Sequence, residues 1–141
     1  MPTPSYDLPA GECVRLAQSK EVGRVVYTEA GQPTVRLVSF VIVDDDVVIC
    51  EQPRRWTDGV QGSVVAFEVD HLNSATNTGW CVVIVGRARR ADTAGRAAER
   101  EGEHRADPSC EPPCAIAMTH VSGQRLRLTP PKGDTGRDEF R

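Results

Sequence analysis

The chain has 141 residues, of which 39% are apolar and 26% charged, so it has the size and composition of one globular domain. Its net charge of −3 lacks the basic excess of a dedicated duplex-binding protein, and nucleic acid is not an expected partner. It contains no apolar run of about 18 residues and no secretory signal, which predicts no membrane association. We therefore expect a soluble protein of the cytoplasm.

Valine dominates the apolar residues: there are 18 Val, six Leu and four Ile. β-Branched side chains suit pleated, half-buried surfaces, and ten Pro and 12 Gly interrupt the chain often, so a sheet or barrel is favoured over a helical bundle. An aromatic content of 5% is low for the hydrophobic core of a small monomer, which favours a homodimer. The five cysteines are odd in number, and we expect reduced, mostly buried thiols.

Hydrophobic periodicity predicts a short helix over residues 12–19, followed by a series of strands. The strands cover residues 24–28, 34–43, 47–50, 63–70 and 79–89, with turns at 29–33 and 44–46 and loops at 51–62 and 71–78. A surface helix is predicted over 92–103 and a loop over 104–113. A last hairpin, of 115–121 and 124–129, would turn at Ser122 and Gly123. We divide the chain into one domain over 1–129 and a disordered tail over 130–141.

The strand over 34–43 is apolar on both of its faces. One face carries Val35, Leu37, Val41 and Val43, and the other carries Val38, Phe40 and Ile42. A sheet with one wet face would alternate more cleanly between apolar and polar residues. The pattern therefore predicts five to seven antiparallel strands in a closed or half-closed barrel, with the outer wall covered by a helix or a second subunit.

Sequence motifs for catalysis or metal binding are weak. The chain has no Gly-x-Ser-x-Gly, no phosphate-binding Gly-rich loop and no Gly-x-Gly-x-x-Gly. The histidines are far apart in sequence. His104, Cys110, Cys114 and His120 have ligand types that suit zinc, but their spacing is irregular, and incidental cysteines are the favoured interpretation. We therefore predict no metal site, and no catalytic residue is identified.

Two groups of residues are candidates for ligand binding. Arg54 and Arg55 lie beside Trp56 in the loop after a strand; guanidinium groups match phosphate oxygens and an indole can stack on a flat ring, although a solvated basic loop is the simpler interpretation. Arg36 lies within an apolar strand, where it either faces a barrel mouth and a ligand or pairs with an acid such as Glu68 or Asp70.

Two residues of the strand over 79–89 are also informative. Gly86 inside this strand marks a bulge or a close backbone approach. Trp80 at its start either packs in a core or interface or forms a shelf for a ligand, and we keep it among the binding candidates.

Several segments together resemble a known family. They are Val22-Gly23-Arg24-Val25-Val26, Gly31-x-Pro33, Val47-Val48-Ile49-Cys50, Val65-Ala66-Phe67-Glu68-Val69-Asp70 and Gly79-Trp80-Cys81-Val82-Val83-x-Val85-Gly86. This combination is similar to the pyridoxamine 5′-phosphate oxidase-related family of flavin-binding split barrels, in its short actinobacterial form. The similarity is good over residues 8–91 and loose over 92–129.

The resemblance implies a mainly β protein with short helices: a six-stranded antiparallel split β-barrel that dimerises and holds FMN at the subunit interface. Some relatives bind the deazaflavin coenzyme F-420 instead. By position, the flavin ring would lie along Arg36, Leu37, Val38 and Ser39. The phosphate would lie near Cys50, Gln52, Arg54, Arg55 and Trp56.

The loop after Cys50 departs from the family pattern. Relatives commonly have Thr at the position of Cys50 and a Gly-Ser-Lys-type segment in the loop. Arg54 or Arg55 can replace that lysine with a bidentate grip, whereas Glu51 places a negative charge beside the phosphate. We therefore expect a flavin-dependent oxidoreductase of unknown substrate. The alternative is a non-catalytic split barrel that binds a small ligand and has lost the phosphate site.

Overall fold

The computed structural model describes residues 6–50, 59–90 and 114–129. These residues form a short helix and eight strands, all antiparallel to their neighbours. In chain order the elements are β1 (Tyr6–Asp7), α1 (Ala10–Gln18), β2 (Val22–Glu29), β3 (Gln32–Val43), β4 (Asp46–Ile49), β5 (Val64–Asn73), β6 (Thr78–Arg90), β7 (Cys114–Ala117) and β8 (His120–Arg127).

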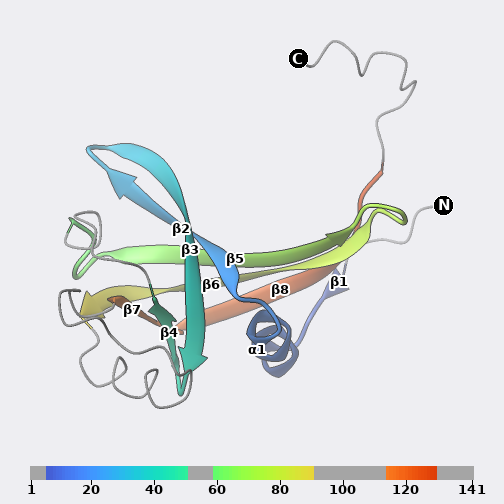
Figure 1. The fold of residues 1–141 in the computed structure, drawn as a ribbon, viewed down its shortest axis with the longest axis horizontal. Coiled ribbons are helices and arrows are strands. Elements are labelled where there is room, and N and C mark those ends of the chain that lie inside the picture. Colours follow the sequence, from blue (N-terminus) through green and yellow to red (C-terminus); the bar gives the residue numbers. More distant parts are fainter. Residues whose placement is uncertain (1–5, 51–58, 91–113, 130–141) are drawn as a thin grey trace, which may run out of the picture.

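Six of the strands close into a barrel. Around the ring the order is β2, β3, β4, β7, β6 and β5, and β5 pairs with β2 to complete it. Valine-rich strands close in this way because closure pairs both edges of the sheet and encloses one apolar face. The predicted mainly β, six-stranded antiparallel barrel is confirmed (Figure 1).

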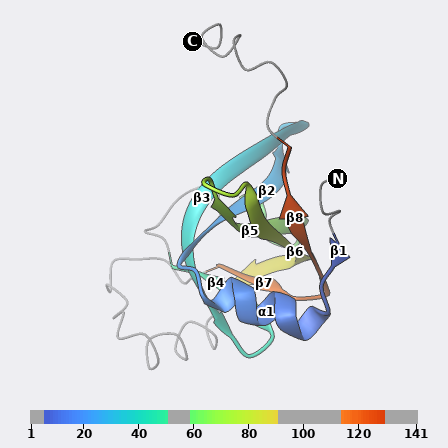
Figure 2. The same cartoon turned by 90° about the vertical axis from the view of Figure 1, so that its right-hand side faces the viewer.

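Beyond the barrel, the long strands β5 and β6 continue together with β8 and β1. β8 pairs with the first half of β6, and β1 pairs with the last part of β8. Helix α1 packs across β8 and β6, below the strands in the end-on view of Figure 2. Cys13 and Ala17 of α1 are fully buried there. The molecule is therefore a barrel with a four-stranded extension that carries the helix on its inner face.

The core fills the barrel and the space beneath α1. The rings of Phe40 and Phe67 meet edge to face at its centre, with their centroids 4.8 Å apart. A second, smaller cluster lies on the other face of the barrel wall and consists of Val43, Val48 and Ala115, with Val41 beside it. The expectation that the strand over 34–43 is buried on both faces is confirmed for this C-terminal part of β3. Val35 and Leu37, in its other half, are exposed.

The β2–β3 connection is tighter than the five-residue turn predicted over 29–33. Ala30 and Gly31 form a two-residue turn with φ of 53° and 79°, which is the geometry that matches the twist of a hairpin. Pro33 lies inside β3, paired with Thr28. The prediction was wrong because a proline is tolerated in a strand where its missing N–H faces an edge with no partner.

The predicted hairpin around Ser122 and Gly123 is wrong. Both residues lie within the continuous strand β8, opposite Val83 and Val82. Glycine is needed at 123 for space and not for a turn, since a Cβ there would lie 2.7 Å from Cys13 Sγ of α1. Strands β7 and β8 also do not pair with each other but with separate parts of β6.

The predicted loop over 71–78 is also shorter than expected. β5 continues to Asn73 and β6 begins at Thr78, so only the residues between them form the connection. Polar side chains do not prevent a ladder, because backbone groups make its hydrogen bonds. The predicted surface helix over 92–103 and tail over 130–141 lie outside the described residues. Within the described ranges, no helix is both long and apolar enough to cross a membrane.

Gly86 marks the place where β6 changes partners. Its neighbour Val85 is the last residue paired with β8, and Ala88 is the first paired with β7. A Cβ at Gly86 would lie 1.7 Å from the carbonyl oxygen of Ala117. The close backbone approach predicted for this glycine is confirmed, and it allows the barrel to close here.

Candidate functional site

Among the residues that the structure describes, one edge of β3 has no strand partner in its N-terminal half. The carbonyl of Ser39 accepts a hydrogen bond from the N–H of Cys50 at 3.0 Å, so the backbone groups of Ser39 point toward β4. Backbone groups alternate sides along a strand, which directs those of Leu37 and Val35 to the same edge. Among the described strands, β4 pairs only with residues 40–43 of β3, and none pairs with this edge before them. Within the described part of the chain, the backbone donor and acceptor of Leu37 therefore face an edge without a strand partner.

The outer face beside this edge is apolar. Val35 is 61% exposed and Leu37 is 63% exposed, and Val22 on β2 and Val64 on β5 are also half-exposed. The register places Val26 opposite Val35 and Arg24 opposite Leu37, so these side chains share the outer face. Contiguous exposed apolar side chains on one face are typical of a binding surface.

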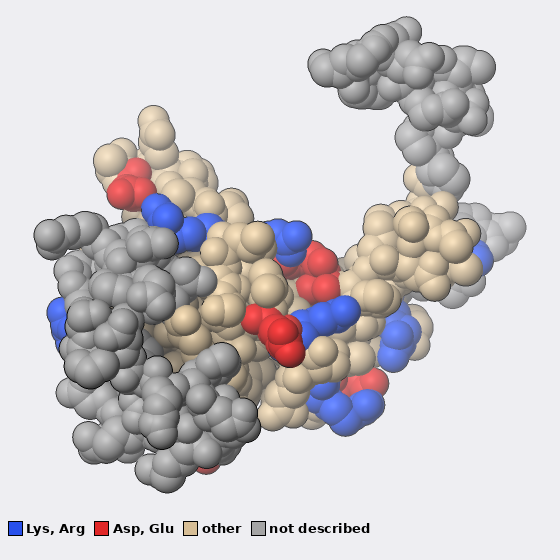
Figure 3. Space-filling model, in the orientation of Figure 1, with Lys and Arg blue, Asp and Glu red and all other residues tan. Residues whose placement is uncertain are grey.

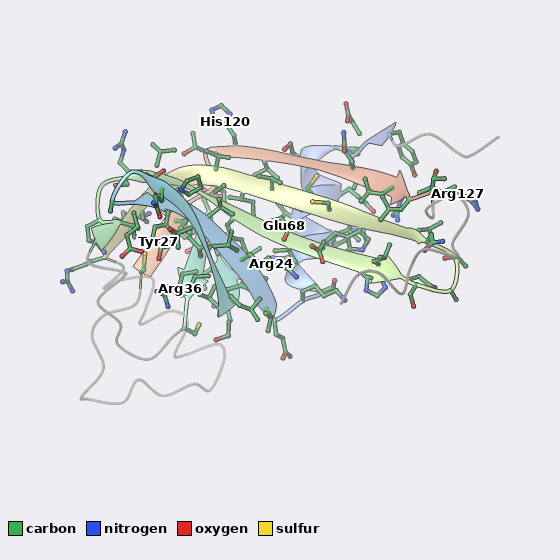
Figure 4. All side chains as sticks on the ribbon, turned by 90° about the horizontal axis from the view of Figure 1, so that it is seen from above. Arg24, Tyr27, Arg36, Glu68, His120 and Arg127 are labelled. Atoms are coloured by element: carbon green, nitrogen blue, oxygen red, sulfur yellow. The ribbon has the colours of Figure 1, made fainter. Side chains whose placement is uncertain are left out.

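A charged cluster lies on the same face, one strand away. The Nη1 of Arg24 donates to Oε1 of Glu68 at 2.9 Å and to Oδ2 of Asp70 at 3.0 Å. The thiol of Cys81, on β6, donates to Oε2 of Glu68 at 3.3 Å. Figure 4 shows Arg24 and Glu68 projecting toward each other from neighbouring strands. Acidic and basic side chains are also neighbours over the face seen in Figure 3.

The cluster changes the ionisation of its members. Burial raises the pKa of Glu68 above its ordinary value of 4.5, and a hydrogen bond with Asp70 adds to the rise. Burial and the Glu68 carboxylate raise the pKa of Cys81 to about 12. The Cys81 thiol therefore stays protonated at neutral pH and is a poor nucleophile. This agrees with the expectation of inert thiols.

The four β3 candidates divide between the two faces of the barrel wall. Leu37 and Ser39 lie on the outer face, whereas Val38 is buried in the core. Arg36 shares the inner parity of Val38, and its Nε donates to the hydroxyl of Tyr27 at 3.3 Å (Figure 4). The prediction that Arg36 pairs with Glu68 or Asp70 is wrong. Both carboxylates form their ion pairs with Arg24 instead.

The remaining candidates are more scattered. Cys50 is half-buried, and its Sγ lies 3.6 Å from the carbonyl oxygen of Val48. Gln52, Arg54, Arg55 and Trp56 lie outside the described residues. Trp80 is 6% exposed, lies on the inner face of β6 and belongs to the core cluster. β2 and β5 separate it from β3, so one copy of the chain does not bring Trp80 to the β3 edge.

The described part of the zinc candidate is not assembled. Cys114 is buried in the core and burial raises its pKa to about 11, while His120 is exposed at the start of β8. His104 and Cys110 lie outside the described residues. Within the described ranges, no group of three His, Cys, Asp or Glu side chains could hold a metal.

A closed six-stranded antiparallel barrel with a helix packed against its extension defines the split-barrel class. The family model described as pyridoxamine 5′-phosphate oxidase matches residues 9–130. The chain therefore belongs to the pyridoxamine 5′-phosphate oxidase family, and the resemblance found in the sequence is confirmed.

Individual relatives are more distant. The uncharacterized protein Rv0080 of Mycobacterium tuberculosis is 37% identical over 90 residues, which are 58% of each chain. The aligned part thus spans less than two thirds of that relative. An FAD-binding protein from Mesorhizobium loti superposes with a TM-score of 0.68 at 21% identity, covering 88% of this chain and 99% of that one. An FAD-binding protein from Mycobacterium smegmatis superposes with a TM-score of 0.66 at 22% identity, covering 87% and 99%.

Sequence reasoning missed the Arg24 cluster, although the signal was present. Arg24 precedes Val25 and Glu68 follows Phe67, so each lies on the outer face of its strand next to an inward core residue. Pairing the two strands in antiparallel register brings them opposite each other. The register itself is a long-range property, and the local pattern did not supply it.

Proposed function

We propose that this protein is a flavin-dependent oxidoreductase that binds FMN along the open edge of β3, between two copies of the chain. The observation that carries the proposal is the open edge beside Leu37 on an apolar outer face. The polar side of a flavin ring has both hydrogen-bond donors and acceptors. The backbone N–H and C=O groups of an unpaired strand edge can match this pattern without any charged side chain.

The residues present fit a flavin in two respects. The exposed side chains of Val35 and Leu37 offer an apolar surface to the flat ring. Pro33 continues the same edge and has no N–H, so the edge is already adapted to lack a strand partner there. A bound flavin would supply the two-electron chemistry, and the chain would bind and orient it. Family membership and the FAD-binding proteins of the same fold support this assignment.

The homodimer is part of the proposal. The exposed side chains of Val22, Val35, Leu37 and Val64 lie on one face, and a second copy would remove them from water. The charges on this face do not oppose its burial strongly, because Arg24 already pairs with Glu68 and Asp70. A symmetric dimer over this face would exclude water from the ring of each flavin and so limit side reactions there.

The phosphate is proposed to bind Arg54 and Arg55. We would change both residues to Ala and titrate FMN, FAD and coenzyme F-420 in separate cells, following flavin fluorescence. At least a tenfold loss of affinity is expected, about 1.4 kcal/mol. The control is Arg15→Ala, which removes an exposed arginine of α1. An unchanged affinity in the double variant would place the phosphate elsewhere.

The same titration distinguishes the flavin-dependent oxidoreductase from the alternative, a non-catalytic split barrel that binds a different small ligand. Saturable binding of any of the three cofactors supports the redox assignment and names the cofactor for substrate screens. If none binds to the unmodified chain, the protein is a split barrel that takes a different ligand, and the oxidoreductase assignment is overturned.

A further inference from the structure

The Arg24 cluster consists of Arg24, Glu68, Asp70 and Cys81, and it contains one more acid than base. A single nitrogen, Nη1 of Arg24, is shared by the two carboxylates, at 2.9 Å from Glu68 and 3.0 Å from Asp70. Cys81 keeps its proton at neutral pH, because its pKa is raised to about 12. With both carboxylates ionised, the cluster therefore has one uncompensated negative charge, and one added proton makes it neutral.

The groups that act on Glu68 come from three strands. Arg24 of β2 and Cys81 of β6 donate hydrogen bonds to it, and Asp70, two residues along β5, is the acid beside it. On β3, the residue opposite Arg24 is Leu37, which has no charge. The balance of charge around Glu68 is therefore set by one guanidinium and one other carboxylate, among the residues that the structure describes.

The strands beyond β6 add little to this balance. On β8, the residue opposite Cys81 is Gln124, which is neutral. Its amide donates to Asp7 of β1 at 3.4 Å, so the next described charge in this row is another acid. His71, on the inner face of β5, and Lys20, whose Nζ lies 3.1 Å from it, are behind the sheet. None of these groups places a second described cation on the outer face beside the cluster.

Apolar side chains surround the Arg24 cluster. Val22 and Val26 project to the same face on either side of Arg24 along β2. Val83 of β6 is opposite Glu68 and is half-buried. Figure 4 shows the side chains of Arg24 and Glu68 midway along the long strands and not at their ends. A second copy of the chain that covers the exposed valines of this face must therefore also cover the cluster.

In a single copy of the chain, water still reaches the cluster. The side chains of Arg24 and Asp70 are 45% and 41% exposed, and that of Glu68 is 21% exposed. Removing water favours the neutral form of an acid over its charged form. Burial already raises the pKa of Glu68, and a cover would raise it further. A dimer over this face is therefore expected to bind a proton more tightly than the monomer does.

We infer that the Arg24 cluster makes the association of two copies of this chain pH-dependent: a proton bound between Glu68 and Asp70 removes the extra negative charge and strengthens the dimer. The inference rests on the proposed dimer over this face and adds its regulation. Because the dimer binds the proton more tightly, its affinity is highest near the ordinary pKa of 4.5 and falls as pH rises through the raised pKa of Glu68. The proposed flavin site lies between the copies, so the same proton would regulate how much of that site is assembled.

Sedimentation equilibrium of the full chain at a series of pH values, from about 5 to about 8 at fixed ionic strength, tests this inference. The dissociation constant of the parent dimer is expected to rise at least tenfold over this range. Glu68→Gln has no charge at any pH and can still accept from Arg24 and Cys81. Its dissociation constant is expected to stay at the tight, acidic value of the parent. The control Glu29→Gln makes the same charge change at the exposed end of β2 and should keep the parent's pH dependence.

A second variant acts in the opposite direction. Arg24→Gln removes the cation and leaves two uncompensated carboxylates, so it is expected to weaken the dimer at least tenfold at neutral pH and to recover affinity in acid. Thermal unfolding checks that each variant folds. A dimer that does not dissociate on dilution is followed through exchange between labelled and unlabelled copies, and exchange is expected to quicken as pH rises.

Two results would overturn the inference and leave the dimer in place. One is a parent dimer whose dissociation constant or exchange rate is the same at every pH. The other is a Glu68→Gln variant with the same pH dependence as the parent. A parent chain that stays monomeric at every pH would overturn the dimer and the inference together, and flavin titration reports separately on the cofactor.

Discussion

The guanidinium of Arg24 lies 2.9 Å from the carboxylate of Glu68, across the pairing of β2 with β5. This contact is on the outer face of the barrel, beside the exposed side chains that we propose a second copy covers. It joins three strands, because Glu68 also accepts from Cys81 on β6. The most distinctive electrostatics of the described chain are therefore on the same face as the proposed flavin site.

The raised pKa of Glu68 gives stability a pH dependence. The folded chain binds a proton at Glu68 more tightly than the unfolded chain, so the free energy of unfolding falls as pH rises from about 4.5 through the folded pKa. Glu68→Gln is expected to remove this part of the slope. Urea unfolding at a series of pH values measures it. The exposed Glu29→Gln makes the same charge change and should keep the slope; equal slopes in both variants and the parent would refute the assignment.

Cys81 is expected to resist alkylation. A pKa of about 12, against an ordinary 9.0, lowers the thiolate population at pH 8 about a thousandfold. Iodoacetamide labelling followed by peptide mass spectrometry should show slow modification in the folded chain and rapid modification in urea. Glu68→Gln removes a carboxylate that contributes to the high pKa and should make Cys81 react faster. Fast labelling of Cys81 in the folded parent chain would contradict the buried contact.

Gly86→Ala is expected to destabilise the barrel. The added Cβ would lie 1.7 Å from the carbonyl oxygen of Ala117, so the strands must separate where β6 changes partners. Overpacking of this kind costs about 1–3 kcal/mol. Gly11→Ala is the matched control, because it lies in α1 with nothing within 4 Å of its Cβ, and it should add about 0.5–1 kcal/mol. Denaturant unfolding compares them; a neutral Gly86→Ala would mean that β7 can move away.

Val35→Glu tests the proposed dimer. Two-fold symmetry would place a new carboxylate from each copy in an apolar interface, and dimer affinity is expected to fall at least tenfold. Light scattering after size exclusion gives the mass at several concentrations. Leu128→Glu adds the same charge to an exposed leucine beyond β8 and should leave the mass unchanged. A parent chain that is monomeric at every concentration would contradict the dimer.

The barrel was predictable because valine-rich strands and tight turns are local signals, and β3 shows them on both faces. Two errors have one cause. Gly123 and Pro33 suggest turns locally, but Gly123 makes room for Cys13 and Pro33 faces an open edge. Neither reason is visible without the tertiary contacts. The Arg24 cluster depends on strand register across three strands, which local pattern does not provide.

Flavin titration of Leu37 variants tests the central claim most directly. Leu37→Pro removes a backbone N–H that points to the open edge and breaks no ladder bond, whereas Leu37→Ala keeps the N–H and shortens the side chain. The unmodified chain is expected to bind FMN with micromolar or tighter affinity, Leu37→Pro at least tenfold more weakly, and Leu37→Ala nearly as well as the parent. Thermal unfolding confirms that the variants fold. Equal affinity of Leu37→Pro and the parent, or no saturable FMN binding by the parent, would contradict a flavin on the β3 edge.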